Sequence, residues 1–433
     1  MVVLIGTLLA ALSTLSYLGP ASDPDARLHH LPLVLVTEDQ GATGPDGTVN
    51  LGDELTEAVT RAAREDARVR WSVVHTRRDA WRMLDDQDAY AALVVPRDFT
   101  GRALSLLGTG HNAGRPMMEI VVPRGVSGVA ASTTDKVMRL TVTEASHRLG
   151  ARLTARAAHQ PRSTTSTHAG RQSPGAAPAG LLTLLDDPVG VTTVVRQPAS
   201  GPVGTAAGAV PLYVAIALLI SGLLPATLLT TFIDARLGYL PLEIGPRRIL
   251  QPVVRITRSS TFVAKAVLGA AMGCSAGAAV SGVALWATGL HPADTGRFVL
   301  FCSTACAAVA LLTLALFAVF GALGQILALF SVTLVGVPLS AGAIPQEELT
   351  GGYDTVGKAL PARHVVEGVR SLLFFDGHGD RVDLAWLVLA GYAAGALLVG
   401  WAVCRWYDHR GYHRAHHHEF QSHRLPEPTT TVP

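Results

Sequence analysis

Residues 210–233 read VPLYVAIALLISGLLPATLLTTFI, and this stretch decides the class of the fold. It contains no acidic or basic side chain. Its length matches the ~20 apolar residues that a helix needs to cross the hydrocarbon core of a bilayer. The stretch therefore predicts a transmembrane helix.

Similar apolar runs occur at the N-terminus and through the second half of the chain. The run from Phe298 to Ser340 is too long for one span and is interrupted by GALGQ at Gly321–Gln325, so it predicts a hairpin of two spans. The other runs are Met1–Gly19, Thr261–Leu290 and Leu384–Cys404. We expect six transmembrane helices in all.

Composition agrees with a membrane protein that carries a polar part. Of the 433 residues, 49% are hydrophobic and 16% are charged, and the mean hydropathy is +0.33. Soluble domains average about 25% charged residues. The net charge of +2 is too small to indicate nucleic-acid binding, so we expect the lipid bilayer, and no nucleic acid, as a partner.

Basic residues orient the predicted spans, because short loops rich in Lys and Arg stay in the cytoplasm. The segment 234–260 and the His- and Arg-rich tail 406–433 are both basic, so both are expected to be cytoplasmic. Residues 20–205 and 341–382 then lie outside. We predict a multi-pass protein of the cell membrane with both termini in the cytoplasm.

The first apolar run allows two interpretations, a retained anchor or a cleaved signal peptide. A signal peptide normally begins with basic residues, but the first basic residue here is Arg27. The retained anchor at 1–19 is the favoured interpretation, and either interpretation leaves residues 20–205 outside.

Residues 20–205 alternate between strand and helix patterns. LPLVLVTED (31–39), VRWSVVH (69–75), YAALVVP (90–96) and MEIVVP (118–123) are typical of strands, and helical patterns separate them. This order predicts an extracellular α/β domain with a mainly parallel sheet, inserted between transmembrane helices 1 and 2. Residues 159–180 are rich in Ser, Thr, Pro and Gly and predict a flexible linker within it. Residues 206–405 form the predicted five-helix membrane block.

The order of these elements, with LPLVLVTEDQG (31–41), NLGDEL (50–55) and YAALVVPRDFTGRAL (90–104), resembles the YhgE/Pip (phage infection protein) group. It also resembles a related group that includes fungal nitrosoguanidine-resistance membrane proteins. Residues 338–374 are similar to the closing segment of type-2 ABC exporter permeases, in which a Leu-Pro and an amphipathic helix with an Arg precede the last span. The matching positions here are Pro345, Pro361 and Arg370, in an extracellular re-entry segment.

The resemblance implies a separate ATP-binding subunit as a partner and is consistent with a homodimer. In such permeases a short coupling helix between spans two and three rests on the ATPase, which here falls in residues 238–258. The candidate coupling residues are Arg247, Arg248, Arg255 and Arg258. The alternative, that these arginines hold the topology and attract anionic lipid, is favoured on sequence alone. Pro241, Pro246 and Pro252 also oppose a long helix there.

Small residues in the third span predict close helix packing. Gly269, Gly273 and Gly277 are spaced four apart and lie on one helix face, within one chain or across a dimer. Cys302 and Cys306 share a face of an apolar span and are interpreted as packing residues rather than as metal ligands. Lys265 is expected to extend to the interface from its place near the end of the third span.

We expect no enzymatic activity, no cofactor and no metal site. GGYDTVGKAL (351–360) has the spacing of a phosphate-binding loop, but Ala359 stands where that loop needs Ser or Thr. We interpret Gly351 and Gly352 as a flexible connection and Ala362–Phe375 as an amphipathic helix. The His-rich tail is interpreted as a disordered, solvated segment.

These observations predict a permease-like subunit of an ABC-type exporter that moves a hydrophobic or amphiphilic compound with the help of a separate ATPase. The alternative is a non-transporting cell-envelope receptor or scaffold of the phage-infection-protein type. An outer enzyme is disfavoured, because no catalytic set of residues is legible in residues 20–205.

Overall fold

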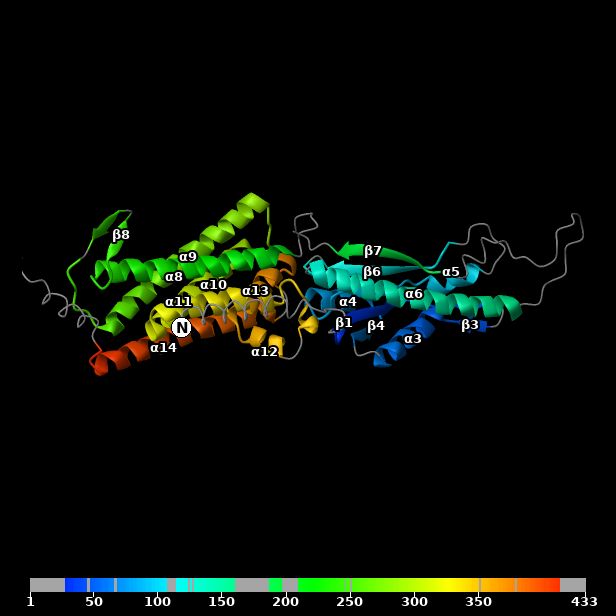
Figure 1. The fold of residues 1–433 in the computed structure, drawn as a ribbon. Coiled ribbons are helices and arrows are strands. Elements are labelled where there is room, and N and C mark those ends of the chain that lie inside the picture. Colours follow the sequence, from blue (N-terminus) through cyan, green and yellow to red (C-terminus); the bar gives the residue numbers. More distant parts are fainter. Residues whose placement is uncertain are drawn as a thin grey trace, which may run out of the picture.

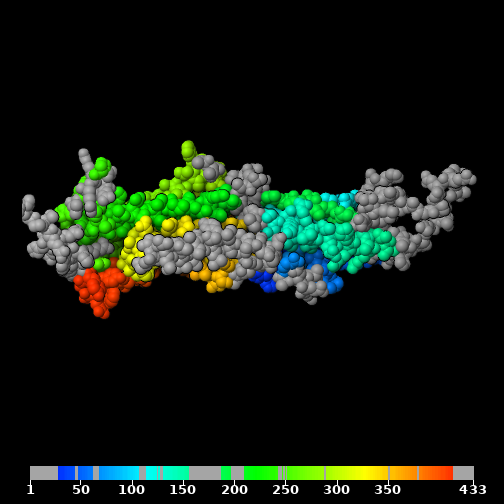
Figure 2. Space-filling model, in the orientation of Figure 1, coloured from blue at the N-terminus to red at the C-terminus, as the bar shows by residue number. Residues whose placement is uncertain are grey.

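The computed structural model describes residues 28–44, 47–65, 68–106, 114–123, 125–126, 128–159, 187–196, 209–244, 246–249, 251–349, 352–377 and 380–412. The predicted first span, most of the predicted linker and most of the tail lie outside these residues. The described parts form an elongated body, with an α/β domain at one end and a helical bundle at the other (Figures 1 and 2).

The α/β domain is built on one five-stranded sheet. Its strands are β1 (Leu31–Thr37), β4 (Val69–Val74), β5 (Ala92–Val95), β6 (Met117–Pro123) and β7 (Gly190–Arg196), in the order β4-β1-β5-β6-β7. Strand β1 runs parallel to β4 and β5, and β6 runs parallel to β7, whereas β5 and β6 are antiparallel. The prediction of a mainly parallel sheet is therefore correct except at the β5–β6 pair. A short hairpin of β2 (Ala42–Gly44) and β3 (Gly47–Val49) lies outside this sheet and was not predicted.

Helices cover both faces of the sheet. Helix α4 (Arg77–Asp85) packs on one face through Ala80 and Leu84, which are fully buried. Helices α3 (Leu51–Glu65), α5 (Phe99–Ser105) and α6 (Gly128–His159) contribute to the core on the other face. Strand β1 is buried along its whole length because both of its faces are covered, which explains its continuous apolar sequence.

The bundle contains four helices that are long and apolar enough to cross a membrane, counted over the described residues. They are α8 (Val210–Arg236), α9 (Arg258–Thr288), α10 (Thr295–Phe320) and α14 (Arg381–His409). Their length and composition make this chain a membrane protein. The prediction of six spans is not met in the described part: the first span lies outside it, and the second half of the 298–340 hairpin is shorter than a span.

That second half begins where α10 ends at Gly321, whose φ of +61° is in the left-handed region. Helix α11 (Ala322–Ala328) continues as a π-helical segment, Leu329–Val335. Together they form an apolar helix of fewer than 18 residues. A helix of this length falls short of the usual ~20-residue span.

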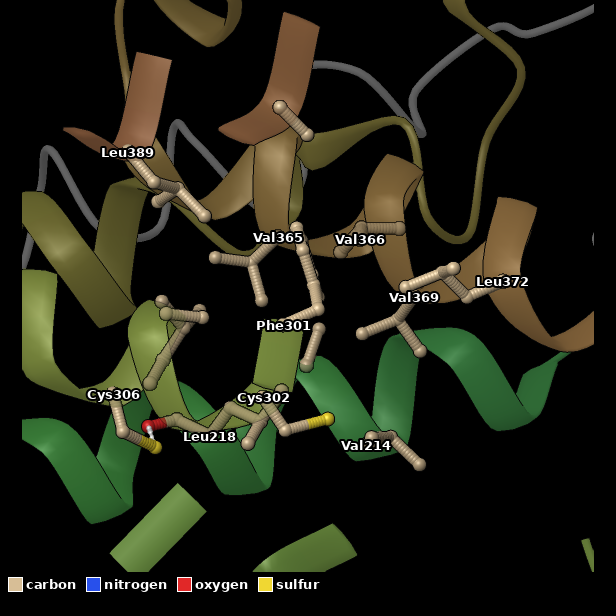
Figure 3. Close-up of a cluster of buried hydrophobic side chains, with 14 of the residues drawn as sticks. Val214, Leu218, Phe301, Cys302, Cys306, Val365, Val366, Val369, Leu372 and Leu389 are labelled. Carbon is tan, nitrogen blue, oxygen red and sulfur yellow. Dashed lines mark hydrogen bonds between the residues drawn. The ribbon is translucent and has the colours of Figure 1, made fainter. Parts of the chain in front are cut away.

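The segment before α14 packs into the bundle rather than on its surface. Short 3-10 turns at Pro338–Ser340 and Gln346–Glu348 precede α12 (Gly352–Lys358), and α13 (Pro361–Phe374) follows. Val365 and Val369 of α13 are fully buried beside Phe301 of α10 and Val214 of α8 (Figure 3). The expected flexible connection at Gly352 is wrong, because this residue begins α12.

Candidate functional site

Glycines of α9 bring its backbone against α10. A Cβ on Gly273 would lie 2.7 Å from the Cα of Ala307, and one on Gly277 would collide with the carbonyl of Cys302. Gly269 faces the side chain of Leu314. All three glycines therefore lie where α9 meets its neighbours within one chain.

The two cysteines of α10 also serve packing. Cys302 and Cys306 are fully buried, and the thiol of Cys306 donates a 3.2 Å hydrogen bond to the carbonyl oxygen of Leu218 (Figure 3). Within the described part of the chain, no group of three His, Cys, Asp or Glu side chains is arranged to hold a metal ion.

A cavity of about 810 Å³ opens among the spans at the end of the bundle away from the α/β domain. The ends of α8, α10 and α14 and the start of α9 form its walls. Small-molecule sites in proteins usually occupy about 300–1,000 Å³. The residues that line the cavity include Asp234, Phe262, Lys265, Leu314, Phe317 and Ala318.

An ion pair lies in the wall of this cavity. Lys265 Nζ of α9 is 2.7 Å from Asp234 Oδ1 of α8, and the two residues are only 5% and 8% exposed. The expectation that Lys265 extends to the interface is therefore wrong. Its ammonium group instead meets a carboxylate on the neighbouring span, which lowers the cost of burying either charge.

The candidate coupling segment between α8 and α9 lies at the same end of the bundle (Figure 1). It contains an antiparallel pair of strands, β8 (Leu242–Ile244) and β9 (Arg247–Ile249), rather than the expected coupling helix. Arg247 and Arg248 are in β9, and Arg255 is exposed further along. Prolines on both sides of the hairpin explain why a helix does not form.

Arg258 has a different place from the other three arginines. It begins α9, its Nε donates a 2.7 Å hydrogen bond to the carbonyl oxygen of Tyr412, and its guanidinium lies 5.2 Å from the ring centroid of Tyr407. The carboxylate of Asp408 accepts its backbone N–H at 2.8 Å, as an anion commonly does at a helix N-terminus. Arg258 thus joins α9 to the end of α14.

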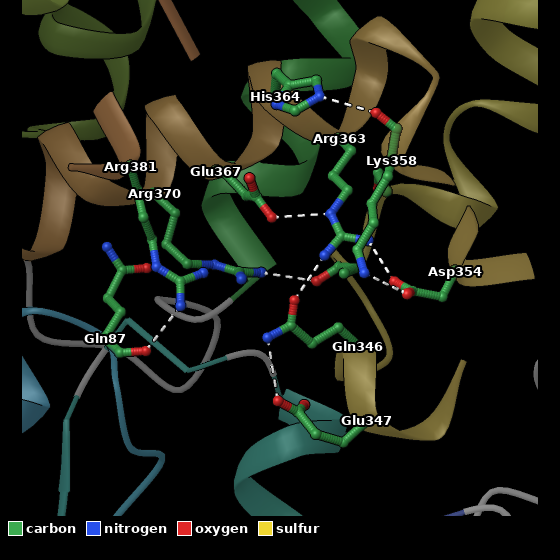
Figure 4. Close-up of polar contacts among 12 residues, drawn as sticks. Gln87, Gln346, Glu347, Asp354, Lys358, Arg363, His364, Glu367, Arg370 and Arg381 are labelled. Carbon is green, nitrogen blue, oxygen red and sulfur yellow. Dashed lines mark hydrogen bonds and ion pairs between the residues drawn. The ribbon is translucent and has the colours of Figure 1, made fainter. Parts of the chain in front are cut away.

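A polar joint connects the α/β domain to the segment before α14. The Tyr90 hydroxyl donates a 2.7 Å hydrogen bond to Glu347 Oε2, and Thr133 of α6 donates a 3.0 Å bond to Glu348 Oε1. Arg381, the first residue of α14, donates a 3.0 Å bond to the carbonyl oxygen of Gln87 (Figure 4). We call this set of contacts the joint.

Burial shifts the pKa of two groups at the joint, Tyr90 and Arg370. It raises the pKa of Tyr90 well above 10.0, and the nearby Glu347 carboxylate raises it further. Burial also lowers the pKa of Arg370, and repulsion from Arg381 adds to this, while Tyr90, Glu367 and Glu347 oppose it. Close packing accompanies these contacts, since a Cβ on Gly125 would collide with the ring of Phe375.

The three predicted re-entry residues contribute to this region. Arg370 donates hydrogen bonds of 3.2 and 3.3 Å to the carbonyl oxygens of Ala341 and Gly342. Pro345 is buried and lines a small cavity of about 40 Å³ at the joint, together with Arg370 and Tyr90. Pro361 is the first residue of α13, where its missing N–H costs nothing.

A second polar cluster, adjacent to the joint, is centred on Arg363 of α13. Its guanidinium contacts Glu367 at 3.0 Å, Asp354 at 2.7 Å and Gln346 at 2.6 Å (Figure 4). Burial would raise the pKa of Asp354, but hydrogen bonds from Lys358 and Arg363 outweigh it and hold the pKa below 3.8. These contacts fix α12 and the turn at Gln346 against α13.

The sequence did not reveal the Asp234–Lys265 pair or the Tyr90–Glu347 bond. The only local signal for the Asp234–Lys265 pair is one acidic residue near the end of an apolar run and one basic residue inside the next apolar run. The partners of the second are separated by 257 positions. Tyr90 and Glu347 both lie in stretches that carry the family resemblance, but the resemblance gives no sign that the two residues meet.

Comparisons with known proteins identify the family of this chain. No curated protein is found to match it. A solved structure from Thermotoga maritima MSB8, described as "a domain of a putative ABC type-2 transporter", matches 38% of this chain and 85% of its own, with 14% identity and a TM-score of 0.25. A likeness of this extent carries no inference about function. A family model matches residues 1–398, and the chain belongs to that family, described as "Protein of unknown function (DUF3533)".

Proposed function

We propose that this protein is a permease-like membrane subunit of an ABC-type exporter, which moves a hydrophobic or amphiphilic compound across the cell membrane. The observation that carries the proposal is the 810 Å³ cavity between the spans. Phe262, Leu314 and Phe317 give it apolar walls, and Asp234 and Lys265 give it one charged region. Such a cavity fits a molecule with an apolar body and a polar end.

The proposed source of energy is a separate ATP-binding subunit. The β8–β9 hairpin extends from the bundle at the end where the cavity opens (Figure 1). We infer that this end is cytoplasmic, because the segment 234–260 is rich in Arg. The hairpin is the proposed docking surface for the ATPase, and two copies of the chain form the proposed transporter.

In this proposal the extracellular α/β domain responds to movement of the spans. The joint bonds the α/β domain to the segment before α14 and to Arg381 of α14 itself. A rearrangement of α14 therefore changes the contacts of the outer domain. In this proposal the chain catalyses no reaction itself. The parts that move during transport are the helices and the α/β domain attached to them.

The test has two arms. The first is affinity purification of the full chain from its own membranes and identification of any nucleotide-binding protein that co-purifies, compared with a variant that lacks residues 238–258. The proposal predicts stimulated ATP hydrolysis with the full chain and loss of the complex with the deletion. If the purified chain neither binds nor stimulates any ATPase, the exporter assignment is overturned.

The second arm blocks the cavity. Ala318→Trp places an indole in its wall, whereas Leu224→Trp, at a position of α8 that is 51% exposed, leaves the cavity open. We expect retention of a lipophilic dye in cells that carry the first variant and normal export with the second. Equal export by both variants contradicts the assignment of this cavity.

The alternative function is that of a non-transporting envelope receptor or scaffold. One observation favours it, a groove in the outer domain that is separate from the spans. Deletion of the gene distinguishes the two functions. A change in resistance to lipophilic compounds supports the exporter, and unchanged resistance together with an altered cell envelope supports the receptor.

A further inference from the structure

The small cavity of about 40 Å³ at the joint lies between the α/β domain and the bundle. Its polar lining comes from Gln87 and Tyr90 of the α/β domain and from Arg370 and Arg381 of the bundle. A water molecule needs about 10–15 Å³ of such a volume, so the cavity has room for a few water molecules or for one small ion. We call it the joint cavity.

Two guanidinium groups lie side by side at the joint cavity (Figure 4). Arg370 belongs to α13, and Arg381 is the first residue of α14. Burial lowers the pKa of Arg370, and repulsion from Arg381 lowers it further, so the two charges are close enough to interact. Guanidinium groups stay charged at neutral pH, and the pair is therefore stabilised by negative charge beside it.

Hydrogen-bond donors at the joint cavity are left without acceptors. The Nε atom of Arg370 is buried and has no hydrogen-bond partner, and the same holds for the side-chain Nε2 atom of Gln87. Within the described part of the chain, Arg370 uses its Nη2 atom for the carbonyl oxygens of Ala341 and Gly342. A buried donor without an acceptor is costly, so a ligand that accepts hydrogen bonds is favoured here.

The two carboxylates that attract Arg370 are bound by other donors. Glu347 accepts hydrogen bonds from the Tyr90 hydroxyl at 2.7 Å and from Gln346 Nε2 at 3.1 Å. Glu367 accepts one from Arg363 at 3.0 Å.

No acidic side chain of the described residues lines the joint cavity itself. A water molecule placed there accepts hydrogen bonds but must also donate its own, and it carries no charge. An anion accepts from several donors at once and offsets the repulsion between the two guanidinium groups. The donors and the paired cations together favour an anion over water.

We propose that the joint cavity binds a small monovalent anion, of the size of chloride, between Arg370 and Arg381. Because these residues belong to α13 and α14, and Gln87 belongs to the α/β domain, the bound anion holds the three parts together. Without the anion, the two guanidinium groups repel each other and the joint is weaker. The proposal concerns the joint alone and does not depend on the exporter assignment.

The experiment uses the full chain in nanodiscs of zwitterionic lipid. Sodium chloride replaces sodium gluconate stepwise at constant ionic strength, because gluconate is too large for the joint cavity. Amide hydrogen exchange is followed in the turn Gln346–Glu348 and in the first turns of α14. Exchange should slow about threefold when chloride reaches twice its Kd, and the effect should then approach saturation.

Three variants assign the effect to the joint cavity. Arg381→Gln removes one of the two charges but keeps N–H donors, and Arg381→Lys keeps the charge. Arg61→Gln is the matched control, since the Arg61 side chain is 72% exposed on α3 and does not line the joint cavity. Each variant is compared with itself in the two salts, so a weaker joint in Arg381→Gln does not mimic a lost response to chloride.

We expect the response to chloride to be absent in Arg381→Gln, present in Arg381→Lys and unchanged in Arg61→Gln. A response that rises without saturation would indicate a general salt effect and would overturn the proposal. Equal exchange of the wild type in the two salts, equal responses of Arg381→Gln and Arg61→Gln, or loss of the response in Arg381→Lys would each overturn it as well.

Discussion

The hydroxyl of Tyr90, two residues before β5, donates a 2.7 Å hydrogen bond to the Glu347 carboxylate in the segment before α14. This bond connects the α/β domain to the bundle. Because its acceptor is charged and its donor is buried, its loss should cost about 1.5–3 kcal/mol.

Tyr90→Phe removes the hydroxyl and keeps the ring. We expect faster amide hydrogen exchange in the turn Gln346–Glu348, because the turn loses its anchor on the α/β domain. Tyr213→Phe is the matched control, since Tyr213 is 68% exposed on α8. Unchanged exchange in Tyr90→Phe would show that the bond does not hold the joint.

The joint should weaken in alkali. The pKa of Tyr90 is raised in the folded state by burial and by Glu347, above its ordinary value of 10.0. The stabilisation is therefore fully present below pH 10 and is lost as the pH rises through the raised pKa. Thermal melts between pH 9 and 11 should show a decline in the wild type that is smaller in Tyr90→Phe. Parallel pH profiles for the two proteins would contradict this prediction.

The cluster around Arg363 should weaken in acid. Hydrogen bonds from Lys358 and Arg363 overcome the effect of burial and hold the pKa of Asp354 below 3.8. The stabilisation from Asp354 is present above pH 3.8 and is lost as the pH falls through the lowered pKa. Asp354→Asn should reduce the melting temperature at pH 7 and flatten its dependence on pH below 4. Asp135→Asn, on the outside of α6, is the control.

Asp234 and Lys265, in the wall of the cavity between the spans, should stabilise each other strongly. Asp234→Asn leaves the Lys265 ammonium without its carboxylate in a buried site, which typically costs about 3–5 kcal/mol. We expect a clear fall in the melting temperature in nanodiscs. The double variant Asp234→Asn/Lys265→Met should recover much of this loss, because no charge is left unpaired. Additive effects would show that the two groups do not stabilise each other.

The glycines of α9 should show a graded response to alanine. Gly273→Ala and Gly277→Ala place a methyl group against the backbone of α10 and should each cost about 1–3 kcal/mol. Gly269→Ala should cost less, because it meets only the flexible end of Leu314, 2.5 Å away. Gly282→Ala has nothing within 4 Å and should be neutral or slightly stabilising. Melting temperatures in detergent test this order, and equal effects at all four positions would refute it.

Much of the architecture could be predicted from local patterns. The long apolar runs predicted α8, α9, α10 and α14, and the break after α10 was expected at Gly321, where the helix ends. Each of these signals is contained within the element that it predicts. The helix after the break is shorter than predicted because it ends at Val335, and a 3-10 turn at Pro338–Ser340 leads from there to Ala341.

Other features depend on partners that a local pattern does not contain. Strand β6 is antiparallel to β5 because of the side from which the chain re-enters the sheet, and no local pattern of residues records that side. The short helix α12 forms because Asp354 and Gly357 pack against α13 and the turn at Leu339. The hairpin of β8 and β9 replaces an expected coupling helix whose only basis was a family resemblance.

The sequence by itself determined that this chain enters a membrane, where most of its spans begin and end, and that an α/β domain precedes them. Hydrophobicity and its periodicity are properties of single helices and strands, so they can be read directly from the order of residues. Only the tertiary structure decided which charges meet, as in Asp234 with Lys265 and Tyr90 with Glu347. Such pairs form because burial makes an unpartnered charge or hydroxyl costly, and burial is a property of the packed molecule.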